Sequence, residues 1–223
     1  MQPYFFPYIG YWQLVSSVDM FVIFDDVNFI RRGYVNRNSI LLNGRSFRIT
    51  LELIGASQNK AINEISVGDN KSLLMKTIWH AYAKKAEYFE EAFPILEDLI
   101  LHDDSNLSTY LTHGILGISR FLELNTTFVF SSDIAKPNGM NGQEKILNIC
   151  KALGATTYIN LPGGRALYDP EWFYKNGVSI EFIEPLNFSY SQLGSQFVRD
   201  LSIIDPLMFL GKERLTSLFA RTN

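Results

Sequence analysis

The chain has 223 residues and a formal net charge of −3, and 47% of its residues are hydrophobic. This length and composition predict one globular domain and exclude disordered, collagen-like and coiled-coil proteins. The weakly acidic balance excludes a protein whose whole surface attracts nucleic acid or anionic lipid. With one cysteine and three histidines, an internal disulfide framework and a cysteine-rich zinc site are also excluded.

The chain begins with an aromatic segment, QPYFFPYIGYW, at residues 2–12. Its two prolines make the loop rigid, and Gly10 allows a ligand or another backbone to approach closely. The loop leads into the N-terminus of a helix predicted at 9–17, which favours anions. We interpret the segment as part of a binding site, the alternative being an aromatic plug for the end of a sheet. The candidate binding residues here are Gln2, Tyr4, Pro7 and Gly10.

The first residues do not predict membrane insertion or export. The run ahead of Asp19 has no charge, but its prolines would break a bilayer helix. It also lacks the basic region and the cleavage site of a signal peptide. We therefore expect a cytoplasmic protein without membrane insertion. A doubly wound fold usually opens on a strand, and none precedes Met1, so a native start upstream of Met1 stays open.

An apolar run at residues 20–24 predicts a buried strand, which is followed directly by Asp25 and Asp26.

The stretch 31–48 holds five arginines and no acid. Its Asn43-Gly44 pair predicts a hairpin with a type I′ turn. Guanidinium groups match phosphate and carboxylate, so the stretch favours a nucleotide, a nucleotide-sugar or another anionic small molecule rather than nucleic acid. The alternative is a solvated hairpin face. The candidates in this stretch are Arg31, Arg32, Asn36, Arg37 and Asn38.

A helical block is predicted at about 67–125, and after it strands and helices alternate. Strands are predicted at 126–130, 156–161 and 178–183, and helices at 141–153 and 171–175. This β-α-β-α-β order is typical of a parallel sheet. We therefore predict a single α/β domain over residues 1–223 with a mostly parallel sheet, a Rossmann-like C-terminal half, an inserted helical block and a β-hairpin.

Ligands of open parallel sheets bind beyond the carboxyl ends of the strands. Three polar segments follow predicted strands: Asp25-Asp26, Ser131-Ser132-Asp133 and Pro162-Gly163-Gly164-Arg165. Each alone is more often a turn or a cap, but together they would offer acceptors, hydroxyls and backbone N–H groups on one rim. The candidates added here are Ser131, Ser132, Gly163 and Gly164, with Tyr190 and Gln192 from a later loop that could cover the site. Ser202-x-x-Asp205 is interpreted as a capping box.

The sequence holds no phosphate-binding loop, dinucleotide fingerprint, nucleophile elbow or metalloprotease histidine pair. Cys150 lies in a predicted amphipathic helix, and we interpret it as a buried structural thiol. The sequence identifies neither a cofactor nor a set of metal ligands.

Four segments resemble the WbqC-like protein family: QPYFFPYIGYW, DDVNFIRRGYVNRN, ILNICKALGATTYINLPGGRALYD and FSYSQLGSQFVRDLSIIDPLMFLG. They cover nearly the whole chain in the family's order. The resemblance implies a small bacterial cytoplasmic protein of a kind often encoded with genes for surface polysaccharides such as lipopolysaccharide O-antigen. Two features depart from the family: a short apolar strand usually precedes the Gln-Pro pair, and a histidine often lies near Tyr190.

The resemblance implies an enzyme that transfers an acyl or aminoacyl group, such as glycine, to a nucleotide-linked amino sugar. In that role Asp25 or Asp26 would act as a base or bind a metal. The arginines Arg31, Arg32 and Arg37 would hold phosphate, and Gly163 and Gly164 would donate N–H groups to developing negative charge. The alternative is a non-catalytic protein of the same pathway that binds the nucleotide-sugar or a pathway enzyme as a scaffold.

Overall fold

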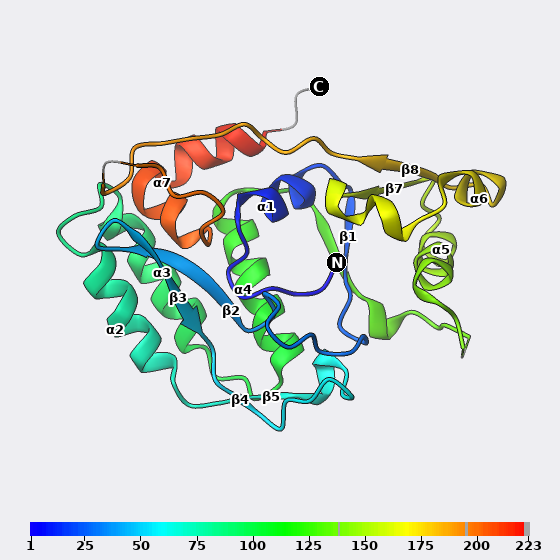
Figure 1. The fold of residues 1–223 in the computed structure, drawn as a ribbon, viewed down its shortest axis with the longest axis horizontal. Helices are drawn as coiled ribbons and strands as arrows, with labels where there is room; N and C mark the ends of the chain where they lie inside the picture. The colour runs from blue at the N-terminus through cyan, green and yellow to red at the C-terminus, as the bar shows by residue number, and fades with distance from the viewer. Residues whose placement is uncertain (138, 195, 221–223) are drawn as a thin grey trace.

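The computed structural model describes residues 1–137, 139–194 and 196–220, which form helices and short strands (Figure 1). The α-helices are α1 Ile9–Ser16, α2 Lys71–Tyr82, α3 Phe89–Leu101, α4 Leu107–Phe121, α5 Gly142–Ala152, α6 Pro170–Lys175 and α7 Ile204–Phe219. The strands are β1 Met20–Ile23, β2 Arg37–Leu42, β3 Arg45–Thr50, β4 Leu53–Ile54, β5 Ser66–Val67, β6 Thr127–Phe130, β7 Thr157–Asn160 and β8 Ser179–Phe182. The 3₁₀ helices are η1 Ile62–Glu64, η2 Ser131–Asp133 and η3 Pro162–Leu167.

The strands pair two by two. β1 pairs with β6 and β7 with β8, both in parallel, whereas β2–β3 and β4–β5 are antiparallel pairs. The prediction of a mixed α/β fold is confirmed, and every element of the predicted β-α-β-α-β half forms. The prediction of an extended Rossmann-like sheet needs correction for the described residues, because β6 hydrogen-bonds to β1 and not to β7. Side-chain periodicity identifies a strand but does not specify its partner.

The hairpin of β2 and β3 has the predicted turn. Leu42 pairs with Arg45, which leaves Asn43 and Gly44 as a two-residue connection. Their φ angles are +51° and +72°, and a type I′ turn requires positive φ at both positions. The turn prediction is confirmed, and the hairpin carries most of the arginine stretch.

Two hydrophobic cores hold the elements together. The larger core joins α1, the helical block α2–α4, α7, the hairpin and the β1–β6 pair, and the aromatic segment lies inside it. The smaller core lies between α5, α6 and the β7–β8 pair, and it contains Cys150. Burial raises the pKa of the Cys150 thiol to about 11, as expected for a structural cysteine.

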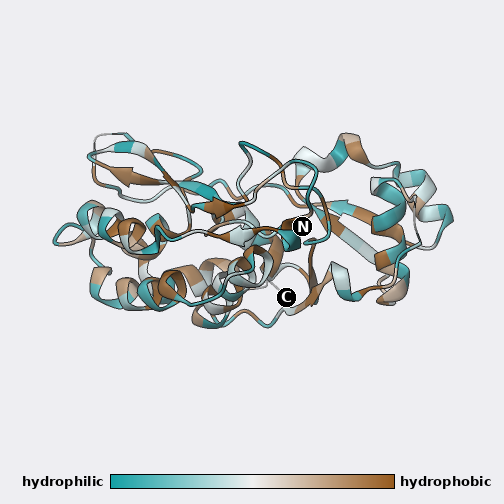
Figure 2. Ribbon diagram, turned by 90° about the horizontal axis from the view of Figure 1, so that it is seen from below, coloured by the Kyte–Doolittle hydropathy of each residue, from teal (hydrophilic) through white to brown (hydrophobic). Residues whose placement is uncertain are grey.

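The two cores define two ends of the molecule. The β7–β8 pair with α5 and α6 lies at one end, and the hairpin and α2 lie at the other (Figure 1). The N-terminus lies between the two ends, also when the molecule is turned by 90° (Figure 2). The aromatic segment is therefore placed centrally, where it can contact both ends. Among the described residues, no helix combines the length and apolar character that crossing a lipid bilayer requires.

Candidate functional site

Asp25 links the ends of the two paired strands β1 and β6. Its side chain is buried, with 3% exposed. One carboxylate oxygen accepts the backbone N–H of Ser132 at 3.0 Å, and the other accepts the Ser132 hydroxyl at 2.8 Å and the Asn63 amide at 3.3 Å. The structure thus brings the predicted residues Asp25 and Ser132 together. Because both of its oxygens accept hydrogen bonds, the main role of Asp25 is structural: it connects the end of β1 with the segments that contain Asn63 and Ser132.

Asp26, the next residue, has one carboxylate oxygen in an ion pair and the other buried without a hydrogen-bond partner in the described residues. The first is Oδ2, which lies 3.0 Å from Nζ of Lys136, and the second is Oδ1. The Lys136 ammonium also donates to the carbonyl and the hydroxyl of Ser131 and to the carbonyl of Ile134. Sequence reasoning missed Lys136; the available signal was a lysine soon after the Ser-Ser-Asp segment.

The aromatic segment is held against the hairpin by hydrogen bonds. Asn38, which is 3% exposed, donates its amide to the carbonyls of Phe5 at 3.1 Å and Phe6 at 2.7 Å. The hydroxyl of Ser202 donates to the same Phe6 carbonyl at 2.7 Å, and Phe6 has a φ of +43°. The predicted residue Asn38 therefore fixes the path of the loop.

Three other predicted residues also have structural contacts. The Pro7 carbonyl accepts Nε1 of Trp12 at 3.0 Å. A Cβ at Gly10 would lie 2.6 Å from Cε2 of Tyr8, so glycine is needed for the Tyr8 ring to lie against the start of α1. Asn36 donates its side-chain amide to the carbonyl of Leu51 at 2.9 Å.

A cluster of tyrosines and arginines forms where the aromatic segment meets the hairpin. We call it the tyrosine–arginine patch and define it as Tyr4, Tyr34, Arg32, Arg37 and Arg48. The ring centroids of Tyr4 and Tyr34 are 6.0 Å apart, and Arg37 donates Nε to the carbonyl of Gly33 at 2.8 Å. Desolvation, and then the charges of Arg48 and Arg32, lower the pKa of Arg37. The patch therefore gathers positive charge around Arg37.

No carboxylate balances these arginines in the described residues. The ion pairs there involve Lys136, Arg165, Lys175 and Lys212, and none of the five arginines of stretch 31–48 takes part. Arg31 is exposed beside Arg32, whose φ is +63°. Arg48 belongs to the site although it was not singled out as a candidate, because its position across the hairpin depends on the strand register.

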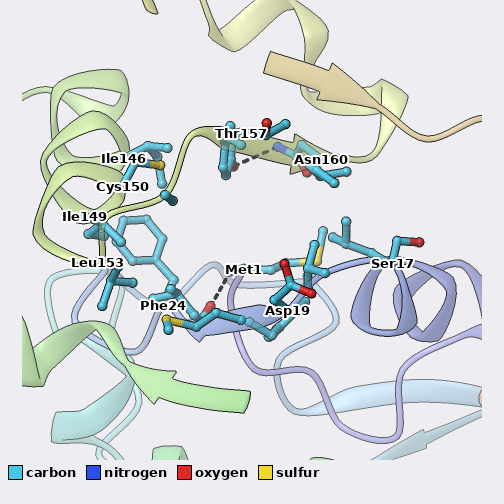
Figure 3. Close-up of a pocket in the computed structure, with 18 of the residues that line it drawn as sticks. Met1, Ser17, Asp19, Phe24, Ile146, Ile149, Cys150, Leu153, Thr157 and Asn160 are labelled. Atoms are coloured by element: carbon cyan, nitrogen blue, oxygen red, sulfur yellow. Dashed lines mark hydrogen bonds between the residues drawn. The ribbon is translucent and has the colours of Figure 1, made fainter. Parts of the chain in front are cut away.

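A cavity of about 690 Å³ lies beside the patch, between β1 and β7. Gln2 and Tyr4 line it together with Met1, and apolar side chains of α5 form its far wall (Figure 3). Tyr4 therefore borders both the cavity and the patch. Through Tyr4, one region of the molecule contains four of the predicted residues: Gln2, Tyr4, Arg32 and Arg37.

The predicted glycine pair lies at the other end of the molecule. Gly163 and Gly164 belong to η3, after β7, and the N–H of Gly164 already donates to the Leu161 carbonyl at 3.0 Å. Among the described residues, no hydrogen bond or ion pair connects this turn with Asp26 or Arg37. That Gly163 and Gly164 share one polar rim with the other strand-end residues stays a prediction.

The C-terminal loop surrounds a buried acid. Asp205 is fully buried and accepts the hydroxyls of Tyr82 at 2.7 Å and Tyr190 at 2.6 Å and the amide of Gln192 at 2.9 Å. Burial raises the pKa of Asp205, against the opposing effect of these donors. The reciprocal capping box predicted for Ser202 and Asp205 is wrong: the Ser202 hydroxyl does accept the Ile204 N–H at 3.3 Å at the start of α7, but the Asp205 side chain bonds to Tyr82, Tyr190 and Gln192 instead. Tyr190 and Gln192 thus hold this acid.

Metal ligands are not grouped in the described residues: no set of three or more His, Cys, Asp or Glu side chains is placed to hold an ion. The described residues group a cationic patch, exposed aromatic side chains and the Asp26 carboxylate, one oxygen of which is buried without a partner there.

Comparisons with known proteins give a family but no activity. The model of the WbqC-like protein family matches residues 2–217. The "Uncharacterized protein Rv1507c" of Mycobacterium tuberculosis is 26% identical over 220 residues, which cover 96% of this chain and 93% of that protein. No solved structure matches the chain.

Proposed function

Because the chain belongs to the WbqC-like protein family, we propose that it binds a nucleotide-sugar, or a similar phosphorylated small molecule, at the tyrosine–arginine patch. The observation that carries this proposal is the grouping of Arg32, Arg37 and Arg48, none of which pairs with a carboxylate among the described residues. Like charges that are held together cost free energy, and a bound phosphate would recover it through charge-assisted hydrogen bonds.

The surroundings of the patch suit the rest of such a ligand. Tyr34 is 58% exposed and offers a ring face on which a base or sugar ring can stack. Gln2 and Tyr4 offer polar groups in the lining of the adjacent cavity. We place the protein in the cytoplasm, in the modification of surface-polysaccharide sugars, on the strength of its resemblance to this family.

The finer proposal is transfer of an acyl or aminoacyl group to a nucleotide-linked amino sugar. The sugar amine attacks the carbonyl carbon of an activated ester or thioester, forming a C–N bond, and the bond from that carbon to the leaving oxygen or sulfur breaks. The leaving group departs with the electron pair of that bond, and the proton of the amine passes to Asp26. This role is supported by Oδ1 of Asp26, which is buried without a partner among the described residues while Lys136 holds the carboxylate through Oδ2.

The second candidate is a non-catalytic protein that binds the nucleotide-sugar and presents it to a pathway enzyme. Two observations favour it: both oxygens of Asp25 are engaged, and the Gly164 N–H is already bonded. Neither group is then free to act as a base or to stabilise an oxyanion.

Replacing Arg37 by glutamine is expected to raise the Kd for UDP-glucosamine about tenfold or more, because a charge-assisted hydrogen bond to phosphate is lost. Isothermal titration calorimetry measures the change. The matched control is Arg45→Gln, which removes an exposed arginine of the same hairpin at its turn and is expected to leave the Kd within about twofold. Equal Kd values for both variants and the parent chain would exclude the patch as the phosphate site.

Replacing Asp26 by asparagine distinguishes the two candidate functions. If Asp26 is the base, turnover of UDP-glucosamine with an acyl thioester falls about a hundredfold or more, while the Kd changes little. If the protein only binds, neither chain shows turnover above the uncatalysed rate, and the variant merely binds less well. Asp133→Asn, at an exposed acid of η2, is the control for loss of charge.

A further inference from the structure

The segment directly ahead of α7 is held against both the aromatic segment and the hairpin. Its Ser202 forms an antiparallel bridge with Tyr8, and the Ser202 N–H donates to the Ser39 carbonyl of β2 at 2.8 Å. The next N–H, that of Ile203, donates to the Pro7 carbonyl at 3.0 Å. Because backbone contacts fix this segment on two sides, the residues just before Ser202 have a defined place beside Tyr8.

Asp200 is the acid that this arrangement brings to the aromatic segment. Burial raises the pKa of Tyr8, and the negative charge of Asp200 raises it further, followed by effects of Tyr4 and Tyr34. A charge acts on a titrating group in this way only when the two lie near each other. Asp200 and the three tyrosines are therefore neighbours, and two of these tyrosines, Tyr4 and Tyr34, belong to the tyrosine–arginine patch.

Arg37 and Arg48 lie on one face of the hairpin next to these tyrosines. Ser39 pairs directly with Arg48, and Arg37 precedes Ser39 by two residues in β2. Paired residues, and residues two positions apart in a strand, share a face. After desolvation and the neighbouring arginines, which lower the pKa of Arg37, Tyr34 is the next group that acts on it. Tyr34 thus connects the arginines with the surroundings of Asp200.

The Asp200 carboxylate has no ion pair or side-chain hydrogen bond within residues 1–137, 139–194 and 196–220. Neither Arg199, the preceding residue, nor an arginine of the patch pairs with it. The residue is exposed, so a ligand can reach its carboxylate. The acid and the arginines therefore leave two opposite charges open to a partner from outside the chain.

Tyrosine rings beside a carboxylate suit an ammonium group. The ring faces attract a cation, and the carboxylate accepts charge-assisted hydrogen bonds from it. The guanidinium groups on the adjoining hairpin face match phosphate. A ligand that carries both charges would satisfy both sides of this region.

We propose that Asp200 is a specificity residue, which selects ligands that carry a protonated amine in addition to a phosphate. The Asp200 carboxylate accepts hydrogen bonds from the ammonium group beside Tyr8, and Arg37 and Arg48 hold the phosphate. This inference rests on the phosphate binding proposed for the patch, and it concerns recognition of the amine before any transfer step. A ligand of the same size with a hydroxyl in place of the amine loses the ionic bond to Asp200.

The test compares UDP-glucosamine with UDP-glucose, which has a hydroxyl in place of the amine. Isothermal titration calorimetry is carried out at about pH 6, where aliphatic amines are protonated. The parent chain is expected to bind UDP-glucosamine about fivefold or more tightly than UDP-glucose. Asp200→Asn is expected to remove this preference by weakening UDP-glucosamine alone, while the Kd for UDP-glucose stays within about twofold.

The choice of asparagine keeps the backbone intact. Asp200 has a φ of +57°, and asparagine adopts the left-handed conformation as readily as aspartate does. Unchanged binding of UDP-glucose would also show that the variant is folded. The matched control is Asp103→Asn, which removes an exposed carboxylate from the loop between α3 and α4 and is expected to keep the preference.

Arg37→Gln provides the complementary measurement. It is expected to weaken both ligands to the same extent, because both carry the phosphates, so the ratio of the two Kd values stays as in the parent chain. A ratio that falls to one in this variant would contradict separate places for the two charges and would overturn the proposal.

The remaining outcomes separate this inference from the function on which it rests. Equal binding of both ligands to the parent chain, or a preference that survives in Asp200→Asn, would overturn the role of Asp200 and leave phosphate binding at the patch intact. Equal weakening of both ligands by Asp200→Asn would make the residue a support of the patch and would also overturn it. If neither ligand binds the parent chain, the proposed phosphate site fails, and this inference fails with it.

Discussion

Replacing Asp205 by alanine is expected to lower the free energy of unfolding by about 3 kcal/mol or more. The change leaves the buried hydroxyl of Tyr82 and the half-buried hydroxyl of Tyr190 without their acceptor, whereas the Gln192 amide still donates to the Val198 carbonyl. Each such group costs about 1 to 3 kcal/mol, which outweighs the relief of no longer burying a carboxylate. Urea unfolding measures the loss. Tyr190→Phe is the graded control, since it removes one donor and should cost about 1 kcal/mol.

Asp205 is also expected to make the free energy of unfolding depend on pH. Burial raises the pKa of Asp205 above its ordinary value of 3.8, so the native state holds the proton more tightly than the unfolded state. This contribution is complete below about pH 3.8 and is lost as the pH rises through the raised pKa. Asp205→Asn should remove this fall, which unfolding curves at several pH values would reveal. A variant with an unchanged slope would show that the acid does not titrate differently in the two states.

The second large effect is expected at Asp25. Asp25→Ala removes the acceptor for the Ser132 backbone and hydroxyl and for the Asn63 amide, and it should cost about 3 kcal/mol. Asp133→Ala, which truncates an exposed acid next to Ser132, should change stability by less than about 0.5 kcal/mol. Thermal and urea unfolding measure both.

We thus expect Asp25 to have a structural role and Asp26 to have the catalytic role. An Asp25→Asn variant that keeps its stability but loses turnover would contradict the structural role of Asp25 and make it the base. A stable Asp26→Asn variant without turnover, next to an unstable Asp25→Ala variant, would agree with the assignment given above. The two neighbouring acids are a suitable pair because they differ in partners while sharing one loop.

The features that could be predicted from the sequence are those in which the partners lie close together along the chain. The turn at Asn43-Gly44 depends on the φ preferences of two adjacent residues. The helix predicted at 141–153 forms, and it begins with a capping box that joins Asn141 and Glu144, three residues apart. In both cases the local free energy is enough to decide the conformation.

Contacts between distant segments could not be predicted in this way. The Ser202-x-x-Asp205 pattern is the same kind of local signal, yet Ser202 bonds to Phe6 and Asp205 bonds to Tyr82, 123 residues away in sequence. Burial decides here, because a polar side chain in the core bonds to whichever donor or acceptor lies beside it. For the same reason Lys136 and Arg48 entered the candidate site only when strand pairing was known.

The attachment of Phe6 has a consequence for the cost of recognition. A bulky residue with positive φ is unfavourable by itself, and here Asn38 and Ser202 together hold its carbonyl in place. The preorganised loop spends no further conformational entropy when a ligand arrives, so contacts with Tyr4 would translate into affinity with little loss. Selectivity would then come from rejecting molecules of the wrong shape rather than from a loop that adapts to them.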